Sequence, residues 1–126
     1  MTAFVVSLVV TLSLALSAVL TGRAGRRRAH VWLVGAMFAS LLVTILCAER
    51  LGRSYDLKAA GAITPVHLML AKITTLAYLG PVITGVCLWR NPRWRTRHRR
   101  AVAVALGLTA VALVTGTWMI LAAERL

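Results

Sequence analysis

The chain has 126 residues, of which 60% are hydrophobic, and it carries 15 Lys and Arg against 3 Asp and Glu, for a formal net charge of +12. A soluble domain of this length could not bury so much apolar surface, so the composition excludes an ordinary soluble enzyme and predicts a small integral membrane protein. Most of the arginines lie in short segments between apolar runs, which indicates membrane topology and not a nucleic-acid-binding surface.

The first apolar run covers residues 4–20 and contains no charge. About 17 apolar residues are enough for a helix to cross the hydrocarbon core of a bilayer. A cleaved signal peptide is the competing interpretation, because residues 14–18 resemble a small-residue cleavage region. Nothing basic precedes the run, however, and four arginines follow it within residues 21–29. We therefore expect a retained membrane anchor with its amino terminus outside.

Three further apolar runs follow, at residues 30–48, 64–89 and 101–123. The third run of the chain starts with Pro65 in its expected first turn, where a missing N–H costs little. Gly80 and Pro81 lie in the middle of the same run and predict a bend, because proline removes one backbone hydrogen bond. The sequence therefore predicts an all-α protein: a single membrane domain of residues 1–126 with four transmembrane helices in an antiparallel bundle.

The charges between the runs predict how these helices are oriented. Residues 21–29 hold four arginines and residues 90–100 hold six, whereas residues 49–63 are nearly charge-balanced. Basic loops are retained in the cytoplasm, so we expect both arginine-rich segments inside and both termini outside. Trp89 and Trp94 flank the second basic segment, where aromatic residues anchor spans at the membrane interface.

Small and polar residues form one stripe on each of the last two predicted spans and should mark helix contacts. In the third span the stripe consists of His67, Ala71, Thr74, Tyr78, Pro81 and Gly85. In the fourth span it consists of Ala105, Thr109, Ala112 and Gly116, and His98 falls on the same face.

The three histidines each lie at the start of a predicted span: His30, His67 and His98. The topology places His30 and His98 on the cytoplasmic side, where they could form a ligand pair for haem iron or copper, and His67 near the other side. The nearby arginines disfavour imidazolium and could pair with haem propionates. The alternative is that all three are polar end residues that satisfy terminal backbone groups or contact lipid headgroups.

Four short motifs in this order resemble the CtaM-type family of small bacterial membrane proteins, which are associated with maturation of haem-copper cytochrome oxidase. They are Arg27-Arg28-Ala29-His30, Val66-His67-Leu68-Met69-Leu70-Ala71, Arg97-His98-Arg99-Arg100 and Thr115-Gly116-Thr117-Trp118. The resemblance implies a role in oxidase assembly in the bacterial inner membrane, with haem b or copper as cargo and the oxidase as partner. It makes His30, His67 and His98 the cofactor-binding positions.

Other functions stay open at this point. The chain could be an accessory transmembrane subunit of a respiratory or photosynthetic complex, or a haem b electron carrier with His30 and His98 as axial ligands. A transporter ranks last, because no inverted repeat is visible. The sequence has no Cys-x-x-Cys, phosphate loop or intramembrane carboxylate pair, so we expect an assembly, cofactor-binding or accessory protein without catalytic residues.

Overall fold

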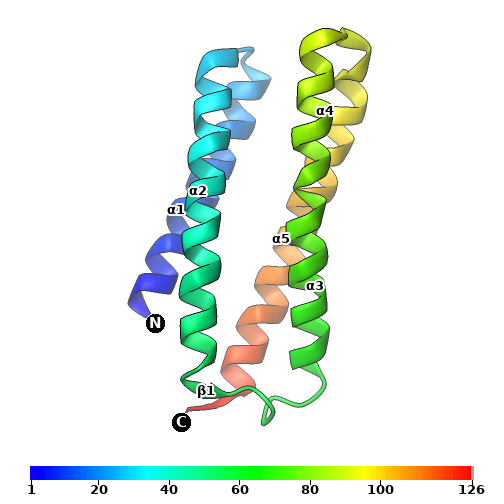
Figure 1. The fold of residues 1–126 in the computed structure, drawn as a ribbon. Coiled ribbons are helices and arrows are strands. Elements are labelled where there is room, and N and C mark those ends of the chain that lie inside the picture. Colours follow the sequence, from blue (N-terminus) through cyan, green and yellow to red (C-terminus); the bar gives the residue numbers. More distant parts are fainter. Residues whose placement is uncertain (126) are drawn as a thin grey trace. The chain divides into compact units, whose positions relative to one another are not determined.

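The computed structural model describes residues 1–125 of the chain, and within them the architecture is helical (Figure 1). The helices are α1 (Thr2–Arg23), α2 (Arg27–Gly52), α3 (Ile63–Ala77), α4 (Leu79–Arg90), the 3₁₀ turn η1 (Pro92–Trp94) and α5 (Arg95–Ala122). Two strands of two residues each, β1 (Tyr55–Asp56) and β2 (Glu124–Arg125), form a two-stranded sheet. The prediction of an all-α fold is confirmed.

The chain divides into two compact units, the first covering Met1–Tyr55 and the second beginning at Asp56. The first unit is a hairpin of α1 and α2, which run in opposite directions (Figure 1). The second is a hairpin in which α3 and α4 together run antiparallel to α5. Four helical segments among the described residues are long and apolar enough to cross a membrane, at Thr2–Arg23, Arg27–Gly52, Ile63–Arg90 and Pro92–Ala122. This confirms the four predicted spans.

The helices extend beyond the predicted apolar runs into the basic segments. The sequence predicts a loop over residues 90–100, but α5 already begins at Arg95. The last six residues of the predicted loop, 95–100, are therefore helical. The loop boundary was wrong because hydropathy marks where a helix leaves the hydrocarbon, not where its backbone hydrogen bonds stop. Arginine favours helix, and its side chain reaches into the headgroup region while its backbone continues the helix.

A glycine closes the turn between α1 and α2. Gly25 has a φ of 70°, a left-handed conformation that costs an L side chain energy. The Arg26 N–H donates to the carbonyl of Thr21 at 3.0 Å and the Gly25 N–H donates to that of Gly22 at 3.3 Å. These two bonds are the Schellman arrangement that ends helices at glycine. The chain is therefore ready to start α2 after only three residues.

Small and hydroxyl side chains line the α1–α2 interface. Ala15 and Ala18 are buried there. Deeper along the hairpin the buried Thr11 hydroxyl lies 2.7 Å from the hydroxyl of Ser40 and 2.9 Å from that of Thr44. Each residue can meet a polar partner without exposing its hydroxyl to lipid, which is how polar side chains hold membrane helices together.

Pro81 interrupts the third span. α3 ends at Ala77 and α4 begins at Leu79, with Tyr78 between them at φ −64° and ψ −18°. Proline at position 81 has no N–H for the carbonyl of Ala77, four residues earlier, and its ring crowds that carbonyl. The interruption therefore lies one turn before the proline, and the two helices continue in nearly the same direction (Figure 1).

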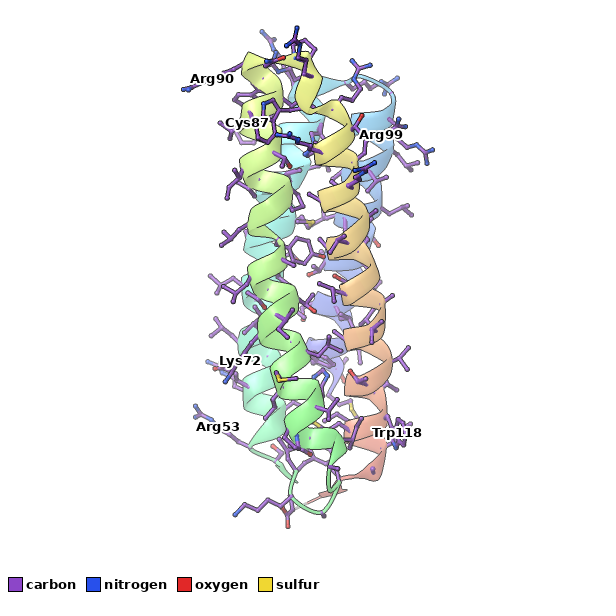
Figure 2. The ribbon with its side chains drawn as sticks, turned by 90° about the vertical axis from the view of Figure 1, so that its right-hand side faces the viewer. Arg53, Lys72, Cys87, Arg90, Arg99 and Trp118 are labelled. Carbon is purple, nitrogen blue, oxygen red and sulfur yellow. The ribbon has the colours of Figure 1, made fainter. Side chains whose placement is uncertain are left out.

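The predicted stripes of the last two spans face each other within the second hairpin. Ala105 is only 1% exposed and Thr74 is buried. The Tyr78 hydroxyl lies 2.8 Å from that of Thr109. Most large apolar side chains point away from this seam, for example Trp118, which is 62% exposed and projects from the side of α5 (Figure 2). In a bilayer that outer surface would contact lipid tails.

Candidate functional site

Each histidine lies against a Thr-Gly pair on the adjacent antiparallel helix. Thr-Gly occurs three times in the sequence, at Thr21-Gly22, Thr84-Gly85 and Thr115-Gly116. In the structure these pairs face His30, His98 and His67 respectively. We call the three arrangements the His30, His98 and His67 contacts.

In the His30 contact, a histidine in the first turn of α2 reaches back to the end of α1. Its Nδ1 lies 2.7 Å from the carbonyl oxygen of Ala18. The hydroxyl of Thr21 donates a longer hydrogen bond, of 3.1 Å, to the same carbonyl. A Cβ on Gly22 would lie 3.0 Å from His30 Nδ1, so the glycine provides the room for the ring.

In the His67 contact, a histidine in α3 meets the last third of α5. Its Nδ1 lies 3.0 Å from the hydroxyl oxygen of Thr115, a residue 48 positions away in the sequence. A Cβ on Gly116 would lie only 2.8 Å from His67 Cε1, closer than such atoms approach in real structures. This is the tightest of the three contacts.

In the His98 contact, a histidine in the first turn of α5 meets the second half of α4. Its Nδ1 lies 3.2 Å from the hydroxyl oxygen of Thr84. A Cβ on Gly85 would lie 3.4 Å from His98 Cε1, which is ordinary contact distance. The His30 and His98 contacts therefore share one arrangement: Thr-Gly near the end of one helix, an arginine-rich turn, and histidine near the start of the next.

The partners of Nδ1 determine the tautomer of each neutral ring. A carbonyl can only accept, so His30 Nδ1 carries the proton that is donated to Ala18. Thr115 donates its own hydroxyl hydrogen to the carbonyl of Val111 at 3.0 Å, and Thr84 donates its own to that of Gly80 at 2.6 Å. Each threonine oxygen therefore accepts from histidine.

His30 thus carries its proton on Nδ1, and the same assignment holds for His67 and His98 when each threonine donates to its own helix. Nε2 is then the nitrogen with a lone pair in the neutral ring. Metal-bound histidines commonly donate the other ring N–H to a carbonyl or similar acceptor, which fixes ring orientation and raises ligand basicity. The geometry of each contact fits an Nε2 ligand for haem iron or copper. It fits a purely structural role equally, because the neighbouring helix provides both a hydrogen-bond partner for Nδ1 and a glycine that leaves room for the ring.

The structure separates His67 from His98. His67 packs beside Thr115 of α5. His98 is also on α5 but lies 17 residues before Thr115, a rise of about 26 Å along the helix. These two histidines therefore cannot bind one ion within a single chain. His30 belongs to the other compact unit, and its pairing with His98 stays a prediction. Within the described part of the chain, no group of three or more His, Cys, Asp or Glu side chains is placed to hold a metal ion.

The threonine and glycine partners were not assigned to the histidines from the sequence. Gly85 and Gly116 were expected on helix contacts, but Gly22 was not, and no pattern along one helix reveals which residue of another it meets. The available signal is the matching number of histidines and Thr-Gly pairs, with one pair beside each arginine-rich turn. That count identifies the partners only once hairpin geometry is known.

Comparisons with protein-family models, with curated proteins and with solved structures find no match to this chain.

Proposed function

We propose that this protein is a membrane-embedded assembly factor that handles haem b or copper during maturation of a haem-copper cytochrome oxidase. The observation that carries the cofactor part of the proposal is the shared placement of His30 and His98, each hydrogen-bonded through Nδ1 to the neighbouring helix beside an arginine-rich turn. Hydrogen bonding through Nδ1 is the arrangement in which Nε2 serves as the metal ligand. The oxidase as the client follows from the sequence resemblance alone.

The proposal assigns the ligand pair to His30 and His98. Both lie next to an arginine-rich turn, and both belong to the same Thr-Gly arrangement. Bound haem would supply the redox-active iron, and arginines 27, 28, 97 and 99 would be close enough in sequence to meet its propionates. The protein's own contribution is to hold each imidazole against the neighbouring helix through its Nδ1 hydrogen bond.

The proposal also includes an arrangement in the membrane. The two hairpins pack as an antiparallel four-helix bundle in a bacterial inner membrane, with both arginine-rich turns in the cytoplasm and both termini outside. The apolar outer surface of the helices supports the bilayer as the surrounding medium. The partner is a larger membrane complex, which receives the cofactor.

Absorption spectra of the purified protein, oxidised and dithionite-reduced, with metal analysis of the same sample, test the cofactor. We expect a stoichiometric haem or copper signal that is lost in His30→Ala and in His98→Ala. His67→Ala is the matched control, because it removes the same side chain and the same kind of hydrogen bond at the other end of the second hairpin. It should keep the signal.

Deletion of the gene tests the client. It should lower the haem content of the assembled oxidase without lowering the amount of oxidase polypeptide. A protein that contains neither haem nor copper after mild purification, together with unchanged oxidase spectra in the deletion strain, contradicts the proposal. Haem that stays bound at fixed stoichiometry, with normal oxidase, would instead identify a haem b electron-transfer subunit.

The second candidate is a structural or accessory subunit of a respiratory or photosynthetic complex. The fit of each histidine ring over a glycine favours it, because helix packing alone then accounts for the three side chains. An accessory subunit should stay with a large complex at fixed stoichiometry through gentle detergent extraction. Recovery as a free protein that still carries haem would exclude this candidate in favour of the first.

A further inference from the structure

The turn between α4 and α5 contains a small hollow that is separate from the histidine contacts. It has a volume of about 220 Å³ and is lined by Asn91, Arg93, Trp94 and Arg97. Pockets for drug-sized molecules start at roughly 300 Å³. The size therefore suits a small polar group better than an extended organic ligand.

The side chains around this hollow are held in place. The Arg97 guanidinium lies over the Trp94 ring, with its central carbon 4.7 Å from the ring centroid. Such stacking uses the flat face of the guanidinium, so its in-plane N–H groups can still donate. The Asn91 side-chain oxygen accepts from the Arg93 N–H at 3.0 Å, which fixes the turn. The amide NH₂ of Asn91 takes no part in this bond.

The chemistry of the lining selects an anion with several oxygens. Two guanidinium groups, an amide NH₂ and an indole N–H are all donors. Residues 90–100 contain six arginines and no Asp or Glu, so no carboxylate within this segment competes for them. Guanidinium groups bind phosphate oxygens in bidentate geometry, which makes a phosphate group the best match.

The place of the hollow identifies the source of that phosphate. It lies where α4 ends and α5 begins. This is the end of the hairpin that holds Arg90 and Arg99, whereas Trp118 lies toward the other end (Figure 2). Trp89, 54% exposed in the last turn of α4, is a typical anchor at the membrane interface. At this depth the nearest phosphates are those of the lipid headgroups.

We propose that Asn91, Arg93, Trp94 and Arg97 form a binding site for the phosphate of an anionic phospholipid headgroup. Arg93 and Arg97 neutralise the phosphate, and Trp94 holds Arg97 in position while it anchors the turn in the interface. The site shares Arg97 with the proposed propionate contacts, but lipid binding needs neither a cofactor nor the histidines, so its test is read apart from that of the proposed function.

Native mass spectrometry of the full-length protein in mild detergent tests this site, with phosphatidylglycerol and phosphatidylcholine as the two probes. We expect one phosphatidylglycerol to be retained in clear preference to phosphatidylcholine. Removing both arginines in Arg93→Gln/Arg97→Gln should weaken that binding by about fivefold or more for each arginine lost. Trp94→Leu keeps the net charge and should also weaken it, because Arg97 loses its support.

The matched control is Arg99→Gln/Arg100→Gln, which removes the same charge from the start of α5 outside the hollow and should weaken the preference clearly less than Arg93→Gln/Arg97→Gln does. Circular dichroism should show equal helicity in all variants. Equal loss in both double variants, with no effect of Trp94→Leu, would mean diffuse attraction and overturn the site. Displacement of the lipid by millimolar inorganic phosphate would identify a soluble anion as the ligand and overturn the lipid assignment.

Discussion

At the scale of single residues, threonine links histidine to the backbone of the neighbouring helix in two of the three contacts. Thr84 and Thr115 each donate to a carbonyl in their own helix and also hydrogen-bond to a histidine on the neighbouring helix. Tyr78 and Thr109 repeat this pattern in the middle of the hairpin, since Thr109 also donates to Ala105 within its own helix. In lipid, where water cannot satisfy these groups, such pairs stabilise a helix contact by about 1 kcal/mol.

The His67 contact gives a steric prediction. Gly116→Ala should lower the free energy of unfolding by about 1–3 kcal/mol, because the new Cβ would lie 2.8 Å from His67 Cε1. Gly107→Ala is the matched control in the same helix, where a Cβ meets nothing within 4 Å. It should be neutral or slightly stabilising, since alanine favours helix over glycine. Thermal unfolding in detergent, followed by circular dichroism, measures both.

A double-mutant cycle separates this clash from a general intolerance of position 116. In a His67→Ala background the ring is absent, so Gly116→Ala should have almost no further effect on stability. If the alanine costs as much without the imidazole as with it, the packing described for this contact is wrong.

At the scale of elements, one proline decides how the third span is built. Pro81 divides the span into α3 and α4, and each part makes its own contact with α5. Tyr78, at the division, bonds to Thr109, while Thr84 beyond it bonds to His98. The sequence predicts a bend at Gly80-Pro81, and the structure places the interruption at Tyr78, where the clash with the proline ring is relieved.

Pro81→Ala should restore the hydrogen bond that the ring removes. The new N–H at position 81 can donate to the carbonyl of Ala77, so we expect its exchange with solvent deuterium to be slow. Pro65→Ala is the matched control: position 65 is the third residue of α3, where N–H groups have no partner within the helix. Its new amide should exchange at least about fivefold faster, as measured by NMR in detergent micelles. Similar rates at both positions contradict this explanation of the interruption.

At the scale of the whole molecule, the chain consists of two helical hairpins with their positive charge concentrated in the turns. The turn of the first hairpin lies among the four arginines of residues 21–29, and that of the second lies among the six of residues 90–100. Each turn also has a histidine contact beside it. The arginines predict the orientation in the membrane, and the histidine contacts hold the two helices of a hairpin together where they enter and leave the turn.

Cysteine labelling tests the proposed orientation. In a chain whose Cys47 and Cys87 are replaced by alanine, Ser54→Cys lies between the hairpins and Thr96→Cys lies in the second basic segment; both positions are exposed. A membrane-impermeant maleimide should label position 54 in intact spheroplasts and position 96 only after the membrane is permeabilised. The reverse pattern would place the arginine-rich turns outside and exclude the predicted topology.

The sequence by itself determined the four spans and the faces of the last two that meet, because hydropathy and helical spacing are properties of a single segment. Only the tertiary structure decided that His67 bonds to Thr115 and His30 to Ala18, and hence that His30 donates from Nδ1. Contacts between residues 48 positions apart depend on the register of two helices. That register results from turns such as the one at Gly25 and from packing over the glycines. No single segment contains that information.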